Sequence, residues 1–226
     1  MMTLVTGRTT APEADSDDPT LHEALAAGWA QRQADEPRGK GRPRSGEAHL
    51  AILSATLDLL VAAGYDGMSI EAVAARAGVG KATVYRRWES KAALVIETLE
   101  TIAAATPPPD TGDTRTDLEQ YVHNLVVGIG HTDYGAILSG LAHELARNDQ
   151  VARIFRENFL RPRRLAIYEI LERGIARGEV RADLDLELVV DLLAGPVYYR
   201  RVISGGRIDA DVGRALVATV YRGIAP

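Results

Sequence analysis

The sequence predicts an all-helical protein made of a small N-terminal helical unit and a larger helical body. Three observations support this class. Apolar residues recur at helical spacing through most of the chain beyond residue 45, no segment alternates apolar and polar residues as a half-buried strand does, and three prolines interrupt the chain at 107–109. We therefore place the first unit at residues 46–105 and the second at residues 110–226.

The composition is that of a globular protein without covalent cross-links. The chain has 226 residues, of which 46% are hydrophobic and 25% charged, and it contains no cysteine. Disulfides and thiol chemistry are therefore excluded. The first 36 residues lack the apolar core of a signal peptide, and no uninterrupted apolar run of about 18 residues offers a membrane span. These observations favour a cytoplasmic location.

The N-terminus divides into a tail and a basic arm. Residues 1–37 mix Thr, Asp, Ala, Pro and Gly, so we expect a mobile tail with room for one short helix over Leu21–Ala34. Residues 38–45 form a glycine-spaced basic arm, and its Arg42 and Arg44 are candidates to lie in a narrow minor groove. A basic linker without any DNA contact is the alternative.

The first helix of the N-terminal unit is expected to begin near Gly46 and to end at Gly64. Apolar residues form one face of this helix, and glycine can adopt the left-handed conformation that ends many helices. The residues of that face are Ile52, Ala55, Leu59, Leu60 and Ala63.

Residues 69–88 have the layout of a helix-turn-helix. Ser69 is placed to cap a short helix that ends at Gly78, and the turn Gly78–Gly80 leads directly into a second, basic helix. Two helices joined so closely must touch, and small or apolar side chains supply the contact: Val73, Ala74, Val79 and Val84. The sequence therefore predicts that the second helix reads DNA in the major groove.

The outward side of the second helix carries the candidate DNA contacts. Polar groups at the starts of helices suit phosphate, because free N–H groups and the helix dipole favour anions there. Ordinary solvated polar residues are the alternative at each position, and for Ser69 a purely capping role. Val84 and Trp88 are expected in the core. With the arm included, the candidate contacts are Arg42, Arg44, Ser69, Lys81, Ala82, Thr83, Tyr85, Arg86 and Lys91.

The charge distribution is compatible with DNA binding although the net charge is -5. Residues 1–37 hold two basic and seven acidic residues, and residues 92–226 hold fifteen basic and nineteen acidic ones. Residues 38–91 instead hold nine basic and five acidic residues. A basic module on an acidic body is attracted to phosphate at one face and repelled elsewhere.

The remainder of the chain is expected to be helical throughout. Ser90 is placed to cap a fourth helix that the prolines at 107–109 stop. Pro162 should kink one helix of the body, and Gly195-Pro196 should bend another. The expected helices of the body run over Thr114–Ile129, Tyr134–Arg147, Asp149–Arg177, Leu186–Ser204 and Asp209–Gly223.

The segment from Gly78 to Leu94 resembles the signature of the TetR family of bacterial transcriptional regulators. The resemblance covers about residues 46–95, and the C-terminal half looks like a variant TetR-type domain. Gly80 stands where the family usually has serine, and Trp88 where it usually has phenylalanine. The resemblance implies an all-helical homodimer with an N-terminal three-helix DNA-binding domain and a larger helical ligand-binding and dimerisation domain.

Two sets of residues in the body bear on dimerisation and ligand binding, and the first stands out independently of the resemblance. Helical stripes in the last two helices are wide enough to pack on a partner or, alternatively, inside one chain: Leu188, Leu192, Gly195, Tyr199, Val212, Leu216 and Val220. Apolar and tyrosine side chains are candidates for a ligand pocket, with the core as the alternative: Tyr121, Leu125, Ile129, Leu138, Leu141, Phe155, Phe159 and Tyr168.

No arrangement of residues indicates catalysis. The five histidines show no metal-ligand spacing, and the chain has no phosphate-binding glycine loop or nucleophile elbow. We therefore expect no enzyme activity, cofactor or metal. The predicted function is a ligand-responsive DNA-binding regulator, a repressor released from a palindromic operator by an unidentified small molecule. A small-molecule sequestering protein with a vestigial helix-turn-helix is the alternative.

Overall fold

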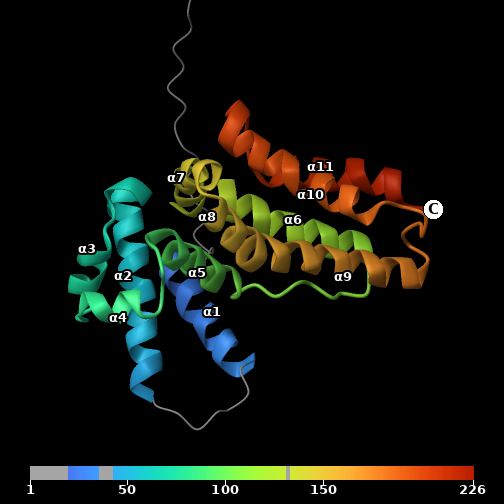
Figure 1. The fold of residues 1–226 in the computed structure, drawn as a ribbon. Coiled ribbons are helices and arrows are strands. Elements are labelled where there is room, and N and C mark those ends of the chain that lie inside the picture. Colours follow the sequence, from blue (N-terminus) through green and yellow to red (C-terminus); the bar gives the residue numbers. More distant parts are fainter. Residues whose placement is uncertain (1–19, 36–42, 131–132) are drawn as a thin grey trace, which may run out of the picture.

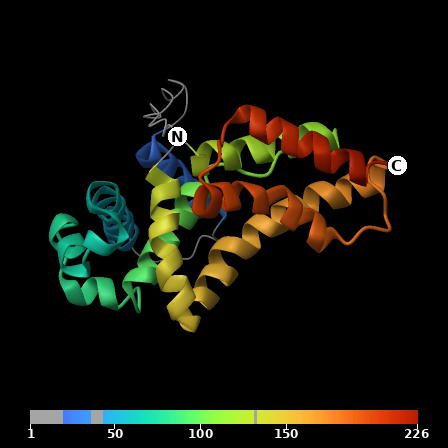
Figure 2. The same cartoon turned by 90° about the horizontal axis from the view of Figure 1, so that it is seen from above.

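The computed structural model describes residues 20–35, 43–130 and 133–226, and within these ranges it contains helices and no strand. Helices α1 to α5 form an N-terminal unit, and α6 to α11 form the body (Figure 1). Viewed from above, the N-terminal helices α2 to α4 lie at one end, the long helices of the body extend to the other, and α7 crosses between them (Figure 2). The all-helical class is therefore confirmed.

Helix α1 spans Leu21–Asp35 and packs on α5 and α2. Leu25 is buried at the contact, and Gly28 approaches α5 so closely that a Cβ there would lie 1.7 Å from the Thr101 carbonyl oxygen. The short helix expected at Leu21–Ala34 is present. This helix buries apolar surface against the N-terminal unit, so the part of the predicted tail over Leu21–Asp35 is docked helix. Residues 1–19 and 36–42 lie outside the described residues, and mobility there stays a prediction.

Helix α2 spans Pro43–Gly67 and is interrupted at Gly64, which has φ 70° and ψ 179°. The break at Gly64 was expected, but the helix begins three residues before Gly46. The basic arm predicted at 38–45 therefore gives way to helix at Pro43, where proline suits the first turn. By length and composition alone, Gly46–Gly67 could cross a membrane. Here its apolar face packs on α1, α3, α5 and α7, as a core helix does.

Helices α3 (Ile70–Arg76) and α4 (Lys81–Tyr85) form the predicted helix-turn-helix. Helix α5 (Lys91–Ala103) follows and begins, as expected, at Ser90, whose hydroxyl accepts a hydrogen bond from the Ala93 N–H at 3.1 Å. One face of α5 packs on α1 and α2, and another packs on α7, α8 and the following segment of the body. Helix α5 thus belongs to the cores of both units.

The helices of the body lie close to the predicted ranges, with two exceptions. The expected single helix over 149–177 is α8, a π-helical segment η1 and then α9, and the expected helix over 186–204 is α10 followed by a π-helical segment η2. Proline has no N–H to donate, so the α-helical hydrogen-bond pattern is disturbed near Pro162, which follows η1 closely, whereas Pro196 lies inside α10 and η2 begins only at Arg200. The elements are α6 (Thr114–Gly130), α7 (Asp133–Arg147), α8 (Asp149–Ile154), η1 (Phe155–Leu160), α9 (Arg161–Arg177), α10 (Leu186–Tyr199), η2 (Arg200–Ser204) and α11 (Ala210–Ile224).

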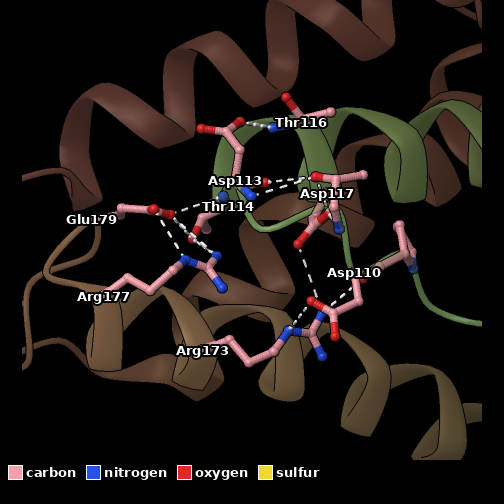
Figure 3. A network of polar contacts seen from close by, with 10 residues as sticks. Asp110, Asp113, Thr114, Thr116, Asp117, Arg173, Arg177 and Glu179 are labelled. Carbon is pink, nitrogen blue, oxygen red and sulfur yellow. Dashed lines mark hydrogen bonds and ion pairs between the residues drawn. The ribbon is translucent and has the colours of Figure 1, made fainter.

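A polar network fixes the connection between the two units to the far end of α9 (Figure 3). Asp117, fully buried in α6, accepts hydrogen bonds from the N–H and hydroxyl of Thr111 at 2.8 and 2.7 Å. Arg173 donates to the Pro109 carbonyl at 2.6 Å and lies 3.7 Å from Asp117. The segment after the three prolines is therefore attached to the body.

The same network closes the turn after α9. Glu179 accepts hydrogen bonds from the Thr114 N–H and hydroxyl at 2.9 and 2.6 Å and pairs with Arg177 at 3.0 Å (Figure 3). These hydrogen bonds, that from Arg177 foremost, lower the pKa of Glu179 to about 2. The carboxylate is therefore charged throughout the physiological range and fixes the start of α6 against the end of α9.

Candidate nucleic-acid interface

The corner of the helix-turn-helix is formed by backbone hydrogen bonds around Gly78. This residue has φ 66°, and the N–H of Val79 donates to the Ala74 carbonyl at 3.0 Å. Glycine adopts this conformation readily because it has no Cβ that would clash with the backbone. Because Val73, Ala74 and Val84 are buried at the contact, the two helices are held at a fixed angle.

Helix α4 presents its polar residues to the outside. Lys81, Ala82, Tyr85 and Arg86 are exposed, Tyr85 with 47% of its surface, while Thr83 is half-buried. On the opposite side, Val84 is fully buried. Val84 and Trp88 thus lie in the core as predicted, and the structure gathers five of the nine candidate DNA contacts on one short helix and the residue after it.

Lys81 is already paired within the protein. Its ammonium forms an ion pair with Glu71 of α3, and its Nζ lies 5.5 Å from the centre of the Tyr85 ring. The hydrogen bond between the two side chains raises the pKa of Lys81 and lowers the pKa of Glu71. Both side chains are more than half exposed, so water and salt screen the pair. A phosphate must compete with Glu71 for this lysine.

The two candidates at helix starts have different surroundings. Ser69 is exposed, and its hydroxyl caps α3 by accepting from the Ala72 N–H at 3.2 Å. Lys91 is half-buried; its ammonium donates to the carbonyls of Tyr65 and Met68 at 2.8 and 3.1 Å and lies 4.3 Å from the centre of the Tyr65 ring. Lys91 therefore lies apart from the exposed candidate DNA contacts, and its two hydrogen bonds join α5 to the end of α2.

The side chains of the two arginines of the arm lie outside the described residues. Arg42 lies outside the described residues. Arg44 is the second residue of α2, and its side chain lies outside them as well. Their proposed place in a minor groove therefore stays a prediction.

A cluster behind α4 holds the end of the helix-turn-helix in place, and sequence reasoning missed it. The indole N–H of Trp88 donates to Glu97 at 2.6 Å, and the other Glu97 oxygen lies 2.9 Å from His49 Nε2. The His49 ring also stacks on Trp29, with centroids 4.8 Å apart, and contacts the Arg87 guanidinium at 3.1 Å. No spacing in the sequence indicates this cluster, because its members come from four separate segments.

The electrostatics of this cluster favour a charged carboxylate. Burial raises the pKa of Glu97, but the hydrogen bond and charge of His49 and the hydrogen bond from Trp88 outweigh that effect and leave the pKa below its usual value. Glu97 therefore stays ionised at neutral pH. A charged acceptor strengthens both hydrogen bonds, which rigidifies the support of α4.

The predicted pocket residues lie in the core of the body, where the structure brings most of them together. Ile129, Leu138, Leu141 and Phe159 are buried, and Phe155 stacks on Phe159 with centroids 4.7 Å apart. Three more are half-buried: Tyr121, Leu125 and Tyr168. A polar surface hollow occurs elsewhere, at the corner of α7 and α8.

The predicted dimer stripe on α10 is exposed. Leu188, Leu192 and Tyr199 have 56%, 48% and 59% of their surface free, and Gly195 is also exposed. Two residues that the sequence reasoning omitted, Val202 (48%) and Ile203 (69%) of η2, add exposed apolar surface just beyond α10.

On α11 the predicted stripe is less accessible. Val212 and Leu216 are half-buried, and Val220 is 9% exposed. Val220 therefore packs mainly within its own chain, which is the alternative that the sequence left open.

Two family models match the sequence. "Bacterial regulatory proteins, tetR family" matches residues 52–98, and "Tetracyclin repressor-like, C-terminal domain" matches residues 108–220. The first match contains the helix-turn-helix, and the second contains most of the body. Helix α1 lies outside both.

Individual relatives agree with these matches. The uncharacterized HTH-type transcriptional regulator YdeS of Bacillus subtilis strain 168 is 37% identical over 186 residues, which cover 82% of this chain and 93% of that protein. The DNA-binding transcriptional repressor TetR of Mycobacteroides abscessus is 31% identical over 169 residues, 73% of this chain and 87% of that protein. The crystal structure of the TetR family transcription regulator SCO0332 is 31% identical, with a TM-score of 0.70, and the match covers 80% of this chain and 100% of that one.

Proposed function

The chain belongs to the tetR family of bacterial regulatory proteins, and we propose that it acts as a dimeric repressor whose α4 reads a palindromic operator until a small molecule releases it. The relatives described above are transcriptional regulators, a class that is typically not enzymatic. A bacterial transcriptional regulator must reach the chromosome, so we expect this protein in the cytoplasm.

The exposed face of α4 carries the proposal. Lys81, Tyr85 and Arg86 project from a helix whose other face is buried and whose end is held by the Trp88–Glu97 hydrogen bond. A rigidly supported helix with lysine, tyrosine and arginine at its surface fits the major groove, where arginine and lysine can reach guanine or phosphate.

The exposed stripe of α10 supports a two-fold dimer. Apolar side chains with about half of their surface free recur at Leu188, Leu192 and Tyr199, on the body and away from α4. Exposed apolar patches of this kind mark interfaces. A two-fold dimer would place two copies of α4 on successive major grooves, about 34 Å apart along B-DNA.

Release follows from a shift between two arrangements of this dimer. An effector that binds the body more tightly in one arrangement increases the population of that arrangement. Repression ends when the favoured arrangement no longer matches the spacing of the grooves. Helix α5 provides the physical link, because it packs on both the N-terminal unit and the body.

The test is selection of bound sequences from a random DNA pool, followed by affinity measurements on the selected duplex. We expect a palindrome and a strong decrease of affinity with salt. Tyr85→Ala and Arg86→Ala should each weaken binding about tenfold, as the loss of about 1–3 kcal/mol per base contact implies. Arg161→Ala, which removes an exposed arginine from α9, is the matched control and should bind as the wild type does.

The alternative function, a sequestering protein with a vestigial helix-turn-helix, predicts a different result. It predicts weak binding without sequence selection and no change on substitution of Tyr85 or Arg86. Unchanged affinity in both variants would therefore overturn the assignment of α4 as the recognition helix.

A further inference from the structure

We propose that the effector is a small aromatic carboxylate whose carboxylate group binds the Arg163 guanidinium, beside the hydroxyl groups of Tyr121, Tyr134 and Tyr198. The inference rests on the proposed function, since it names the class of molecule that would release the repressor. It concerns an arginine inside the body, next to the predicted pocket residues.

Arg163 turns inward from the first turn of α9 and has neutral partners. Its guanidinium donates to the Tyr134 hydroxyl at 2.9 Å and to the Phe159 carbonyl at 2.6 Å. The guanidinium carbon also lies 3.4 Å from the centre of the Phe159 ring. Tyr121 completes the group by donating to the Arg163 carbonyl at 3.0 Å. The charge is thus surrounded by dipoles and an aromatic face.

Arg163 lacks an ion-pair partner among the described residues, where no carboxylate oxygen lies within 4.0 Å of it. Glu100 of α5 lies near enough to interact with its charge. Burial, however, raises the pKa of Glu100 to about 7, so this carboxyl is only partly ionised at neutral pH. A half-buried cation without a full counter-charge favours an anionic ligand.

The tyrosines around Arg163 suit the remainder of such a ligand. Burial raises the pKa of Tyr121 to about 12 and raises the pKa values of Tyr134 and Tyr198 as well, so all three remain neutral. Neutral phenols can donate or accept hydrogen bonds. Phe155 stacks on Phe159, and the Phe159 ring in turn lies against the Arg163 guanidinium, so the two rings bring apolar surface next to the charged group where an aromatic ring could pack.

Both π-helical segments adjoin this cluster. Segment η1 ends three residues before Arg163, and η2 begins two residues after Tyr198. Turns of this kind are less well hydrogen-bonded than α-helix and are frequent at functional sites. They are the parts of the body where the chain can rearrange to admit a ring between Phe159 and Arg163.

A ligand at Arg163 would act directly on α5. Segment η1 packs on α5, and the charge of Glu100 on that helix, which pairs with Arg32 of α1 at 3.8 Å, also interacts with the charge of Arg163. One turn earlier, Glu97 of the same helix holds Trp88 at the end of the helix-turn-helix. An anion bound at Arg163 would repel the ionised fraction of Glu100 and displace η1, and α5 would transmit this displacement to the support of α4.

The experiment is calorimetric titration of the full-length wild-type protein with benzoate, 4-hydroxybenzoate, cinnamate and 2-naphthoate. The neutral amide of each acid serves as its control. We expect at least one carboxylate to bind at least tenfold more tightly than its amide. Arg163→Gln should abolish this preference, whereas Arg161→Gln, two residues away and exposed, should keep it. Tyr134→Phe is a milder change that should weaken binding of the carboxylate several-fold. It provides the test if the Arg163→Gln variant does not fold.

The outcomes separate this inference from the proposed function. If none of the four acids is preferred over its amide, or if the preference survives Arg163→Gln in a folded protein, the inference is overturned. If a carboxylate binds through Arg163 but the protein selects no DNA, the ligand site stands and the repressor function fails. If DNA is selected and bound while no carboxylate binds, the function stands and the ligand class is wrong.

Discussion

Trp88 donates its indole N–H to Glu97 across 2.6 Å, and this hydrogen bond joins the segment after α4 to α5. The bond connects residues nine positions apart, one in the connection to α5 and one in its second turn. Because Glu97 also contacts His49 of α2, three segments meet at a single carboxylate. The position of α4 thus depends on a side chain of the helix that enters the body.

Trp88→Phe should destabilise the protein by about 1–2 kcal/mol, because a charged acceptor in a largely buried site loses its donor. The ring remains apolar and buried, so the fold should persist. Urea unfolding measures the change. Trp29→Phe is the matched control, since that ring stacks on His49 and can do so as phenylalanine; equal losses in both variants would mean that the hydrogen bond contributes nothing specific.

Gly28→Ala should detach α1 from α5, because the added Cβ would meet the Thr101 carbonyl oxygen at 1.7 Å. We expect a loss on the order of 2–4 kcal/mol, typical of overpacking at a helix contact. Trypsin should then cleave faster after Arg32, whose guanidinium contacts Thr101 in the docked state. Gly223→Ala, in a helix with open space at the Cβ position, should leave the cleavage rate unchanged. An unchanged rate in both variants would contradict close docking of α1.

Glu100→Gln should make stability less dependent on pH. Burial raises the folded-state pKa of Glu100 from 4.5 to about 7, so its protonated form favours folding. That contribution is complete below about pH 4.5 and is lost as the pH rises through 7. When the pH is raised from 5 to 8, the free energy of unfolding of the variant should therefore increase by on the order of 2 kcal/mol relative to that of the wild type. Thermal unfolding at both pH values measures this, and Glu172→Gln, an exposed change on α9, should give no such gain.

Gly80→Ser should add a cap to α4. Gly80 occupies the N-cap position with φ -72° and no side-chain hydrogen bond, and a Cβ there has room. A serine hydroxyl can accept from the first turn or donate to a phosphate. We expect a gain of a few tenths of a kcal/mol in stability and operator affinity raised about two- to five-fold. Gly80→Ala lacks the hydroxyl; if it improves affinity equally, the cap is not the cause.

Leu192→Glu should convert the proposed dimer into monomers, because it places a charge in the exposed apolar stripe of α10. Sedimentation velocity at micromolar concentration measures the change in mass. Val61→Glu introduces the same charge at a similarly exposed valine of α2, which has 44% of its surface free. That control should remain dimeric, and dimers in both variants would place the interface elsewhere.

Local signals in the sequence located most of the fold. Ser69, Gly78 and Ser90 set the boundaries of their helices through caps and positive φ, which are properties of single residues and their neighbours. Helical periodicity likewise gave the ranges of the body helices. The docking of α1 escaped prediction because its contact depends on Gly28 meeting a carbonyl more than seventy residues away.

The candidate site was predictable only on its outer side. Lys81, Tyr85 and Arg86 stand out because they are polar and share a short helix. Lys91 suggested a phosphate contact from its place at a helix start, yet its ammonium bonds to two carbonyls of a distant turn. No local pattern in the sequence indicates the cluster of Trp29, His49, Trp88 and Glu97 or the surroundings of Arg163, because packing between distant segments creates both.

Helix α5 carries the partner of Trp88 and the neighbour of Arg163 one turn apart. Substitutions in α5 that are selected for a response to a new effector would therefore also change the strength of repression in the absence of effector. Changes confined to η1 or η2 leave the support of α4 intact. A directed-evolution library for a biosensor should accordingly vary those two segments and keep α5 constant, so that response and basal expression can be adjusted separately.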